Sequence, residues 1–313
     1  MTPRKEEQLM TGAGILAQHG LTAEPAAPAS PLRFPDGAHF RIEIPSVEGP
    51  AVLAAVLAEA HARGVTVNRV SQGSGAMMLT AAELAEMARI GADAGIEVSL
   101  FVGPREEWDT GVAGHADESL AGQLRGTRQL RYAVDDIQRA AEQGIRGFLI
   151  ADAGLLQLMA GLQAAGQLPA SIVWKVSAVL APSNPLGFRV LEQLGGTTIN
   201  VPSDLTLGQL AEMRAASLVP IDLYVETPDA MGGVVRGHEA ADLISVAAPM
   251  YVKFGLRNSR SLYPSGLHLV GEAAAIAREK VHRAEVALEW ISRSGLELVQ
   301  SGPGAKGLGI PEP

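Results

Sequence analysis

Residues 171–177, SIVWKVS, and residues 250–255, MYVKFG, are short runs of aliphatic, β-branched and aromatic residues, and each contains one lysine. Runs of this kind are typical of buried β-strands. Working outward along the chain, six more runs share this character: IDLYVE (221–226), TTINVP (197–202), RGFLIAD (146–152), EVSLFVG (97–103), VTVNRVS (65–71) and FRIEIP (40–45). The centres of neighbouring runs lie 24 to 31 residues apart, except for a third gap of 50. Each shorter gap has room for one crossover helix and two short loops.

The gaps contain helical patterns. Residues 49–64, 80–95 and 130–144 are rich in Ala, carry apolar residues at a spacing of three and four, and end in Gly. Thr80 and Glu83 have the spacing of a capping box. A strand followed by a helix, eight times, predicts an α/β fold of the (β/α)8 TIM-barrel type over residues 37–295. A doubly wound open sheet is the alternative, although no dinucleotide-binding fingerprint follows the first strand.

The two ends of the chain lack this periodicity. Residues 1–36 read as an N-terminal arm and linker, which we expect to be flexible or to contact another subunit of a homo-oligomer. Residues 296–313 form a C-terminal tail, and its last part, SGPGAKGLGIPEP (301–313), is rich in Gly and Pro, so we expect it to be loosely held.

Composition excludes several classes of function. The net charge of −9, from 25 Lys and Arg against 34 Asp and Glu, argues against a nucleic-acid partner. With no Cys, the chain has no disulfide, no thiolate metal site and no cysteine nucleophile. The sequence shows neither a transmembrane stretch nor a signal peptide, so we expect a cytoplasmic protein without a membrane partner.

The polar residues of the strands point to a site inside the barrel. If Ile172, Trp174 and Val176 face the helices, Lys175 faces the interior, because side chains alternate along a strand. The same argument directs five further side chains inward: Glu43, Asn200, Tyr224, Glu226 and Lys253. Asp152, which closes the fourth strand, is expected to point toward the same cavity. These residues lie near the carboxyl ends of strands, where barrel enzymes have their active sites. A salt-bridged structural plug is the alternative interpretation.

We therefore expect the catalytic residues to be Lys175, Glu226, Asp152, Glu43 and Lys253. Asn200 and Tyr224 would bind substrate, together with loop residues at the same end: Ser71, Gln72, Arg105 and Arg257. Arginine suits a carboxylate or phosphate, so the expected partner is a small anionic substrate. The long segment from Arg105 to Arg125 is expected to act as a lid over the cavity.

No cofactor is firmly implied. The seven His show no short ligand spacing, and no HExxH, GxSxG or Walker sequence occurs. Glu43, Asp152 and Glu226 would together suit Mg or Mn. The two nearby lysines count against a metal, because each would place a cation beside it.

Several runs resemble a family of barrel proteins grouped with the collagenase-like peptidases, peptidase family U32. These runs are FRIEIPSVEGP, VNRVSQGSGAMML, SLFVGPREEWDTG, LYVETPDAMGG and YVKFGLRNSRSLYPSGLHL, and the resemblance extends over residues 39–292. It implies a TIM-type barrel. Better-known members carry conserved cysteines and act on peptides, RNA or quinone precursors, and this cysteine-free chain offers no position for that chemistry.

The residues favour a lyase or isomerase that acts on a small oxygenated anionic metabolite. Lys175, ahead of Lys253, would form a Schiff base or polarise a carbonyl, and a carboxylate would move the proton. The alternatives are a metal-assisted, peptidase-like hydrolase and a non-catalytic ligand-binding barrel. On the first hypothesis, Lys175→Met should lower activity by roughly a thousandfold.

Overall fold

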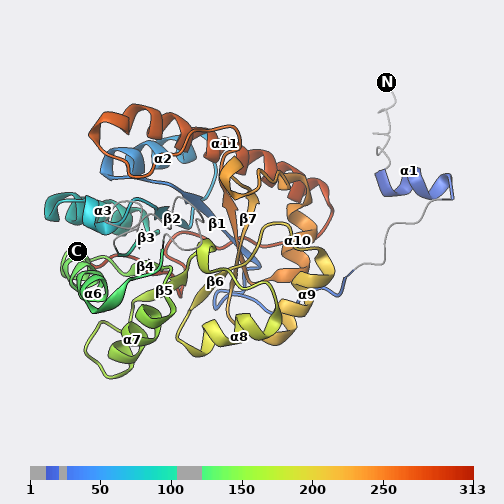
Figure 1. Ribbon diagram of the computed structural model, residues 1–313. Helices are drawn as coiled ribbons and strands as arrows, with labels where there is room; N and C mark the ends of the chain where they lie inside the picture. Colours follow the sequence, from blue (N-terminus) through green and yellow to red (C-terminus); the bar gives the residue numbers. More distant parts are fainter. Residues whose placement is uncertain (1–11, 21–26, 104–121) are drawn as a thin grey trace.

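The eight predicted strands form one closed parallel barrel (Figure 1). The computed structural model describes residues 12–20, 27–103 and 122–313. Neighbouring strands pair in sequence order, and β8 pairs with β1, with Glu43 opposite Lys253. The barrel prediction is therefore confirmed, and the open-sheet alternative is wrong. The strands are β1 (Phe40–Pro45), β2 (Arg69–Gln72), β3 (Glu97–Phe101), β4 (Gly147–Ile150), β5 (Val173–Val176), β6 (Thr198–Asn200), β7 (Ile221–Glu226) and β8 (Met250–Phe254).

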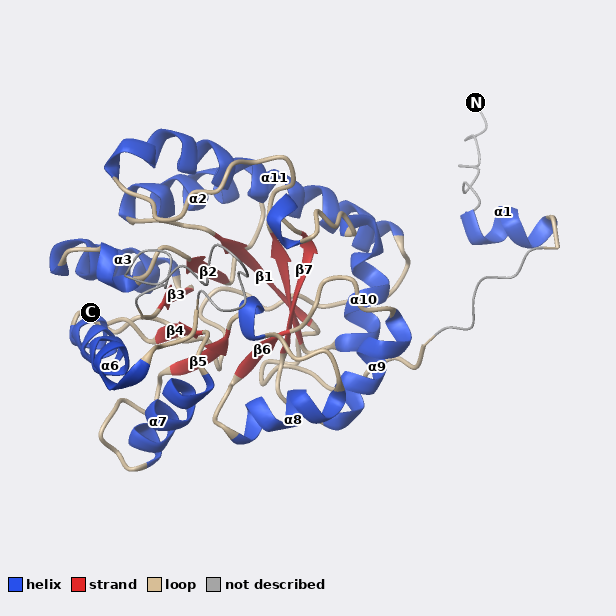
Figure 2. Ribbon diagram, in the orientation of Figure 1, coloured by secondary structure: helices blue, strands red, loops and turns tan. Residues whose placement is uncertain are grey.

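The helices that follow the strands surround the barrel (Figure 2). In the described residues α1 (Gly12–Gln18) comes first, and each strand is then followed by one α-helix: α2 (Pro50–Arg63), α3 (Ala81–Ala94), α6 (Gly126–Glu142), α7 (Ala153–Ala164), α8 (Pro185–Gln193), α9 (Leu207–Ala216), α10 (Ala240–Ala247) and α11 (Val270–Arg293). Short 3₁₀ turns lie in the loops: η1 (Ala76–Met78), η3 (Ala178–Leu180), η4 (Asp229–Met231), η5 (Gly237–Glu239) and η6 (Leu267–Leu269). Thr80 and Glu83 form the predicted capping box at the start of α3.

The alternation of side chains divides the interior into two zones. Trp174 is fully buried between the barrel and the helices, where it stacks on Phe148 with ring centroids 5.7 Å apart. The opposite parity places charged side chains inside the barrel, among them the fully buried Lys175 and Glu43. Apolar residues thus make the helix-facing core, and polar residues fill the barrel.

The C-terminal tail closes the amino-terminal end of the barrel, so the expectation of a loosely held tail is wrong. Ser301 N–H donates to Phe40 O at 3.1 Å, and Glu312 N–H donates to Gly144 O at 2.8 Å. Gly309 N–H donates to the Glu97 carboxylate at 3.1 Å. Glycine and proline here allow close approach of the backbone, for instance at Gly309, where a Cβ would lie 2.7 Å from a backbone oxygen.

The last part of the N-terminal arm packs at the same end. Ser30 N–H donates to Ser245 O at 2.7 Å, and Phe34 is buried edge-on against Tyr251. The described residues contain no helix long and apolar enough to cross a membrane.

Candidate active site

A buried ion network occupies the barrel interior. Lys175 Nζ donates to Glu43 Oε1 and lies 3.8 Å from Asp222 Oδ2. Glu43 also accepts from the Ser71 hydroxyl at 2.7 Å. Lys253 Nζ lies 3.6 Å from the same Glu43 oxygen. Glu43 therefore joins β1, β2, β5 and β8, as expected for converging inward side chains.

Arg69 is the hub that the sequence prediction missed. Its guanidinium pairs with Glu97 at 2.6 Å, Asp222 at 3.1 Å and Glu43 at 3.3 Å. It also lies over the Tyr251 ring at 3.4 Å from the centroid. Strand alternation could have identified it. Asp222 lies two residues before the inward-facing Tyr224 on β7, and Arg69 lies two residues before Ser71 on β2, so both side chains point into the barrel.

The charges in this network shift the pKa values of its members. Burial opposes ionisation of Glu43, but the charges of Lys175, Lys253 and Arg69 outweigh it and lower the pKa of that carboxyl. Burial lowers the pKa of Lys175 to about 7; Glu43 opposes this shift and the positive charge of Lys253 adds to it. Lys175 can therefore exchange a proton near neutral pH.

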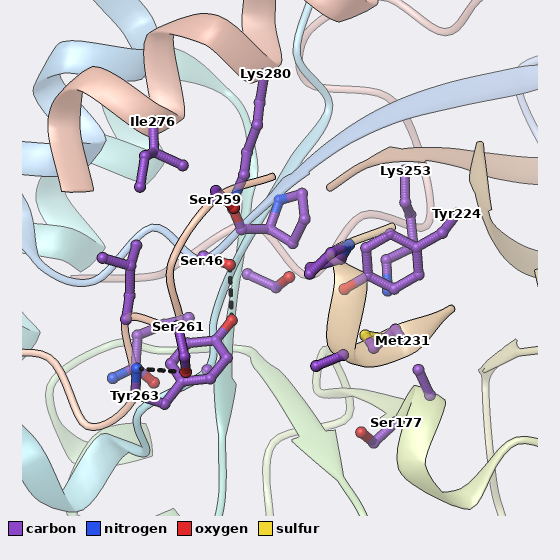
Figure 3. Close-up of a pocket in the computed structure, with 18 of the residues that line it drawn as sticks. Ser46, Ser177, Tyr224, Met231, Lys253, Ser259, Ser261, Tyr263, Ile276 and Lys280 are labelled. Atoms are coloured by element: carbon purple, nitrogen blue, oxygen red, sulfur yellow. Dashed lines mark hydrogen bonds between the residues drawn. The ribbon is translucent and has the colours of Figure 1, made fainter. Parts of the chain in front are cut away.

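Above this network, at the carboxyl ends of the strands, lies a cavity of about 200 Å³, here called the upper cavity (Figure 3). Lys253 lies in its floor, where its ammonium donates to Asn200 Oδ1 and lies 4.0 Å from the centroid of the Tyr224 ring. Lys175 does not line the cavity and lies beneath it. Other side chains that line the cavity include Ser46, Ser71, Gln72, Ser177, Met231, Arg260, Tyr263 and Lys280.

Lys280 is a second lysine in the wall of the upper cavity, and it comes from α11. Its ammonium donates to Pro45 O at 2.9 Å. Burial lowers its pKa to about 8, and the charges of Glu48 and Glu226 partly offset that effect. Strand parity could not reveal this residue, because it reaches the cavity from a helix.

The Gly-rich turn after β2 binds an anion that belongs to the protein itself. The Glu48 carboxylate accepts from Gly73 N–H at 2.8 Å and from Ser74 N–H at 3.0 Å. The Gln72 side chain closes the same turn by bonding Gly75 N–H and Gly75 O, each at 3.0 Å. The turn therefore shapes the cavity wall, and these amides are occupied.

Two of the expected catalytic carboxylates point elsewhere. Asp152 is the N-cap of α7 and accepts from Leu155 N–H at 2.8 Å and Leu124 N–H at 3.0 Å. It has the parity of Phe148, which faces the helices, so its expected inward direction is wrong. Glu226 follows an irregularity in β7 that places it opposite Phe254. There it accepts from Arg257 N–H at 3.0 Å and lies 3.5 Å from Arg283 of α11.

The loop arginines also separate. The exposed Arg257 side chain lies 3.3 Å from Asp229 and does not line the upper cavity, whereas Arg260 lies at its rim and pairs with Glu272 at 3.3 Å. Arg105 lies outside the described residues, as does most of the segment expected to form a lid.

The proposed metal ligands do not converge. Among residues 12–20, 27–103 and 122–313, no three His, Asp or Glu side chains are grouped to hold a metal ion. Glu43, Asp152 and Glu226 each have the separate partners described above. The arrangement in the described residues is thus one of lysines around a cavity, rather than of carboxylates.

No protein-family model matches the chain, and no curated protein matches it. Among solved structures it is similar to a candidate fructose-1,6-biphosphate aldolase from Coccidioides immitis, with 11% identity, a TM-score of 0.49, and coverage of 82% of this chain and 91% of that one. It is also similar to a truncated form of the 3-deoxy-D-arabino-heptulosonate 7-phosphate synthase from Thermotoga maritima, with 13% identity, a TM-score of 0.47, and coverage of 85% of this chain and 91% of that one. For a U32 peptidase the identity is 15% and the TM-score 0.41, with coverage of 76% of this chain and 98% of that one. Such likeness concerns the fold, so the role of each residue rests on the geometry here.

Proposed function

We propose that this chain is a lyase or isomerase that acts on a small anionic carbonyl compound in the upper cavity. One observation carries the proposal. The chain has only five lysines, and three of them, Lys175, Lys253 and Lys280, are buried in or directly beneath the upper cavity. Burying an ammonium is costly, and a lysine amine is the usual protein nucleophile for Schiff-base chemistry with carbonyl compounds.

Lys253 is the proposed nucleophile, because it joins the cavity to the ion network. After Lys253 has given a proton to Lys175, its amine adds to the substrate carbonyl carbon, and loss of the carbonyl oxygen as water leaves an iminium ion. The iminium nitrogen then accepts the electron pair of a bond that breaks at the adjacent carbon. In an isomerase this is a C–H bond, whose proton passes to Lys280, which is neutral after protonating the departing oxygen. In a lyase it is a C–C bond, and the other fragment departs as an aldehyde after its hydroxyl has given a proton to Lys280. Asn200 and Tyr224 hold the Lys253 side chain in place.

Two lysines move the protons in this scheme. Lys175 accepts the proton that Lys253 loses, because Glu43 Oε1 contacts both nitrogen atoms and the pKa of Lys175 is about 7. Lys280, with a pKa of about 8, donates a proton to the departing oxygen from the α11 side of the cavity. This scheme places Lys253 ahead of Lys175 as the covalent residue.

The substrate's anionic group binds near the rim, at Arg260. The hydroxyls of Ser71, Ser177 and Tyr263 line the same cavity and suit an oxygenated body. The Gln72 side chain contributes indirectly, because its hydrogen bonds to Gly75 fix the turn that forms part of the cavity wall. The cytoplasmic location and the homo-oligomer stay predictions.

Borohydride trapping tests the proposal. The protein is incubated with pyruvate or glyceraldehyde 3-phosphate, two small anionic carbonyl compounds, reduced with borohydride, digested and analysed by mass spectrometry. We expect a covalent adduct on Lys253 that is absent in Lys253→Met. Lys175→Met should trap roughly a hundredfold more slowly at pH 7, with partial recovery at higher pH. Lys306→Met, which removes an exposed lysine, is the matched control.

An adduct confined to Lys306, or equal trapping in wild type and Lys253→Met, would contradict the Schiff-base assignment. Tight binding of these compounds without any adduct would favour the ligand-binding barrel. The metal-assisted hydrolase has less support, because its three carboxylates do not meet in the described residues.

A further inference from the structure

A second cavity, here called the lower cavity, lies at the amino-terminal end of the barrel. It has a volume of about 260 Å³, and its wall contains three arginines: Arg33, Arg41 and Arg69. The other residues that line it include Phe34, Val173, Leu218, Pro220, Pro249 and Tyr251. No Asp or Glu among the described residues lines it.

Arg41 is the unusual member of this wall. Its side chain is only 1% exposed. Its guanidinium donates to Ser301 Oγ at 3.0 Å, Tyr251 Oη at 2.9 Å and Lys306 O at 2.7 Å. It also lies 4.0 Å from the centroid of the Phe34 ring. All of these partners are neutral.

The charge of Arg41 therefore has no counter-ion in the described part of the chain, where no carboxylate oxygen lies within 4.0 Å of it. Arg69 differs, because three carboxylates pair with it. A buried cation without an anion is costly. A purely structural arginine that tied the tail to β1 would be expected to pair with an acidic residue.

The donor capacity of Arg41 is also incompletely used. A guanidinium has five N–H groups, and the contacts above use three of them. Arg33 at the mouth donates only to Ser30 O and Leu32 O, at 2.9 and 2.7 Å, and has no acidic partner among the described residues. Among the described residues, two arginines without an acidic partner thus line the same cavity.

We propose that the lower cavity binds the oxyanion of a small phosphorylated or carboxylated metabolite, at a site separate from the upper cavity. Arg41 and Arg33 bind the oxyanion, and the apolar walls at Phe34 and Leu218 contact the rest of the molecule. Arg69 in the wall of this site pairs with Glu43, which also lies 3.6 Å from Lys253, so one ion network connects the two cavities.

Titration calorimetry at constant ionic strength tests this site, with inorganic phosphate and succinate as separate probes. Arg33→Ala removes one cation, and Leu218→Trp narrows the mouth; both positions are exposed, so neither change threatens the fold. Each should weaken binding by about tenfold or more. Arg131→Ala, at an exposed arginine on α6, is the matched control and should leave affinity unchanged. The relative affinities of the probes distinguish a phosphate from a carboxylate ligand.

Lys253→Met distinguishes binding in the lower cavity from binding in the upper one, because Lys253 lines only the upper cavity. The proposal requires that this variant retain the affinity of the lower cavity for the better probe. It is overturned if neither probe binds the wild type at millimolar concentration, or if Lys253→Met abolishes binding that Arg33→Ala and Leu218→Trp leave intact. A failure of the Schiff-base reaction would leave this site untouched, because its evidence is independent of that chemistry.

Discussion

At the scale of single residues, the buried lysines differ in how their charge is compensated. Lys175 has Glu43 as a direct partner, whereas in the described part of the chain the one hydrogen-bond acceptor of Lys280 is the carbonyl of Pro45. Desolvation without a paired anion favours the neutral amine. The interior therefore contains two lysines, Lys175 and Lys280, that can release protons near physiological pH, whereas an apolar barrel core would contain no titrating group.

The pKa of Lys280 predicts a pH-dependent stability. It is lowered to about 8 in the folded protein, against 10.5 for an ordinary lysine. Between these values the unfolded chain binds more protons than the folded one, so stability rises with pH through this window; below pH 8 the full cost of burial is present. Relative to Lys280→Met, the wild type should gain up to about 3 kcal/mol between pH 8 and 10.5.

Denaturant unfolding of both proteins from pH 7 to 10.5 measures this gain. Lys306→Met serves as the exposed control and should follow the wild type at every pH. Parallel curves for wild type and Lys280→Met would mean that Lys280 titrates normally in the fold.

At the scale of elements, the turn after β2 determines the shape of the upper cavity. Glu48 binds its amides, and Tyr263 packs directly on Gly73 while bonding Ser46 at 2.7 Å. A Cβ on Gly73 would lie 2.4 Å from the Tyr263 ring. Only glycine therefore allows this contact between the β2 turn and the segment after β8.

Gly73→Ala should displace Tyr263 rather than unfold the protein, because the clash involves the far end of one side chain. We expect covalent trapping to slow by about tenfold, with a loss of stability of about 1–3 kcal/mol. Gly161→Ala is the control, since a Cβ there meets nothing within 4 Å inside α7, and it should stabilise by roughly 0.5–1 kcal/mol. Unchanged trapping in Gly73→Ala would show that Tyr263 does not shape the working cavity.

At the scale of the whole molecule, the tail completes the barrel. Residues 300–313 supply acceptors to Arg41, an N–H to Glu97 and an ion pair from Glu312 to Arg146 at 3.0 Å. Without the tail, Arg41, Glu97 and Arg146 would lose these partners, and the amino-terminal end of the barrel would be open to water. Residues 300–313 thus belong to the folded unit, at the end of the barrel opposite the upper cavity.

Truncation after residue 299 should therefore lower the free energy of unfolding by at least about 3 kcal/mol, because it strips partners from buried charges. Chemical denaturation monitored by circular dichroism measures the loss. Lys306→Ala should have little effect, since only the backbone carbonyl of that residue contacts Arg41. A truncated chain as stable as the full one would show that the tail merely covers the barrel.

Much of the architecture follows from local sequence alone. The spacing of apolar runs predicted all eight strands and the barrel, and the alternation within β5 and β8 directed Lys175 and Lys253 inward. These features depend on a period of two residues and on short connections, which neighbouring residues determine. The same alternation along β2 and β7 directs Arg69 and Asp222 into the barrel, although the prediction did not include them.

Tertiary structure decided which polar residues share a cavity. The irregularity in β7 turned Glu226 toward α11, and the start of α7 used Asp152 as a cap. Lys280 enters from a helix, and the tail meets Arg41 across some 260 residues of chain. Such contacts arise from the closure of the barrel, which brings distant segments together, and no local periodicity encodes them.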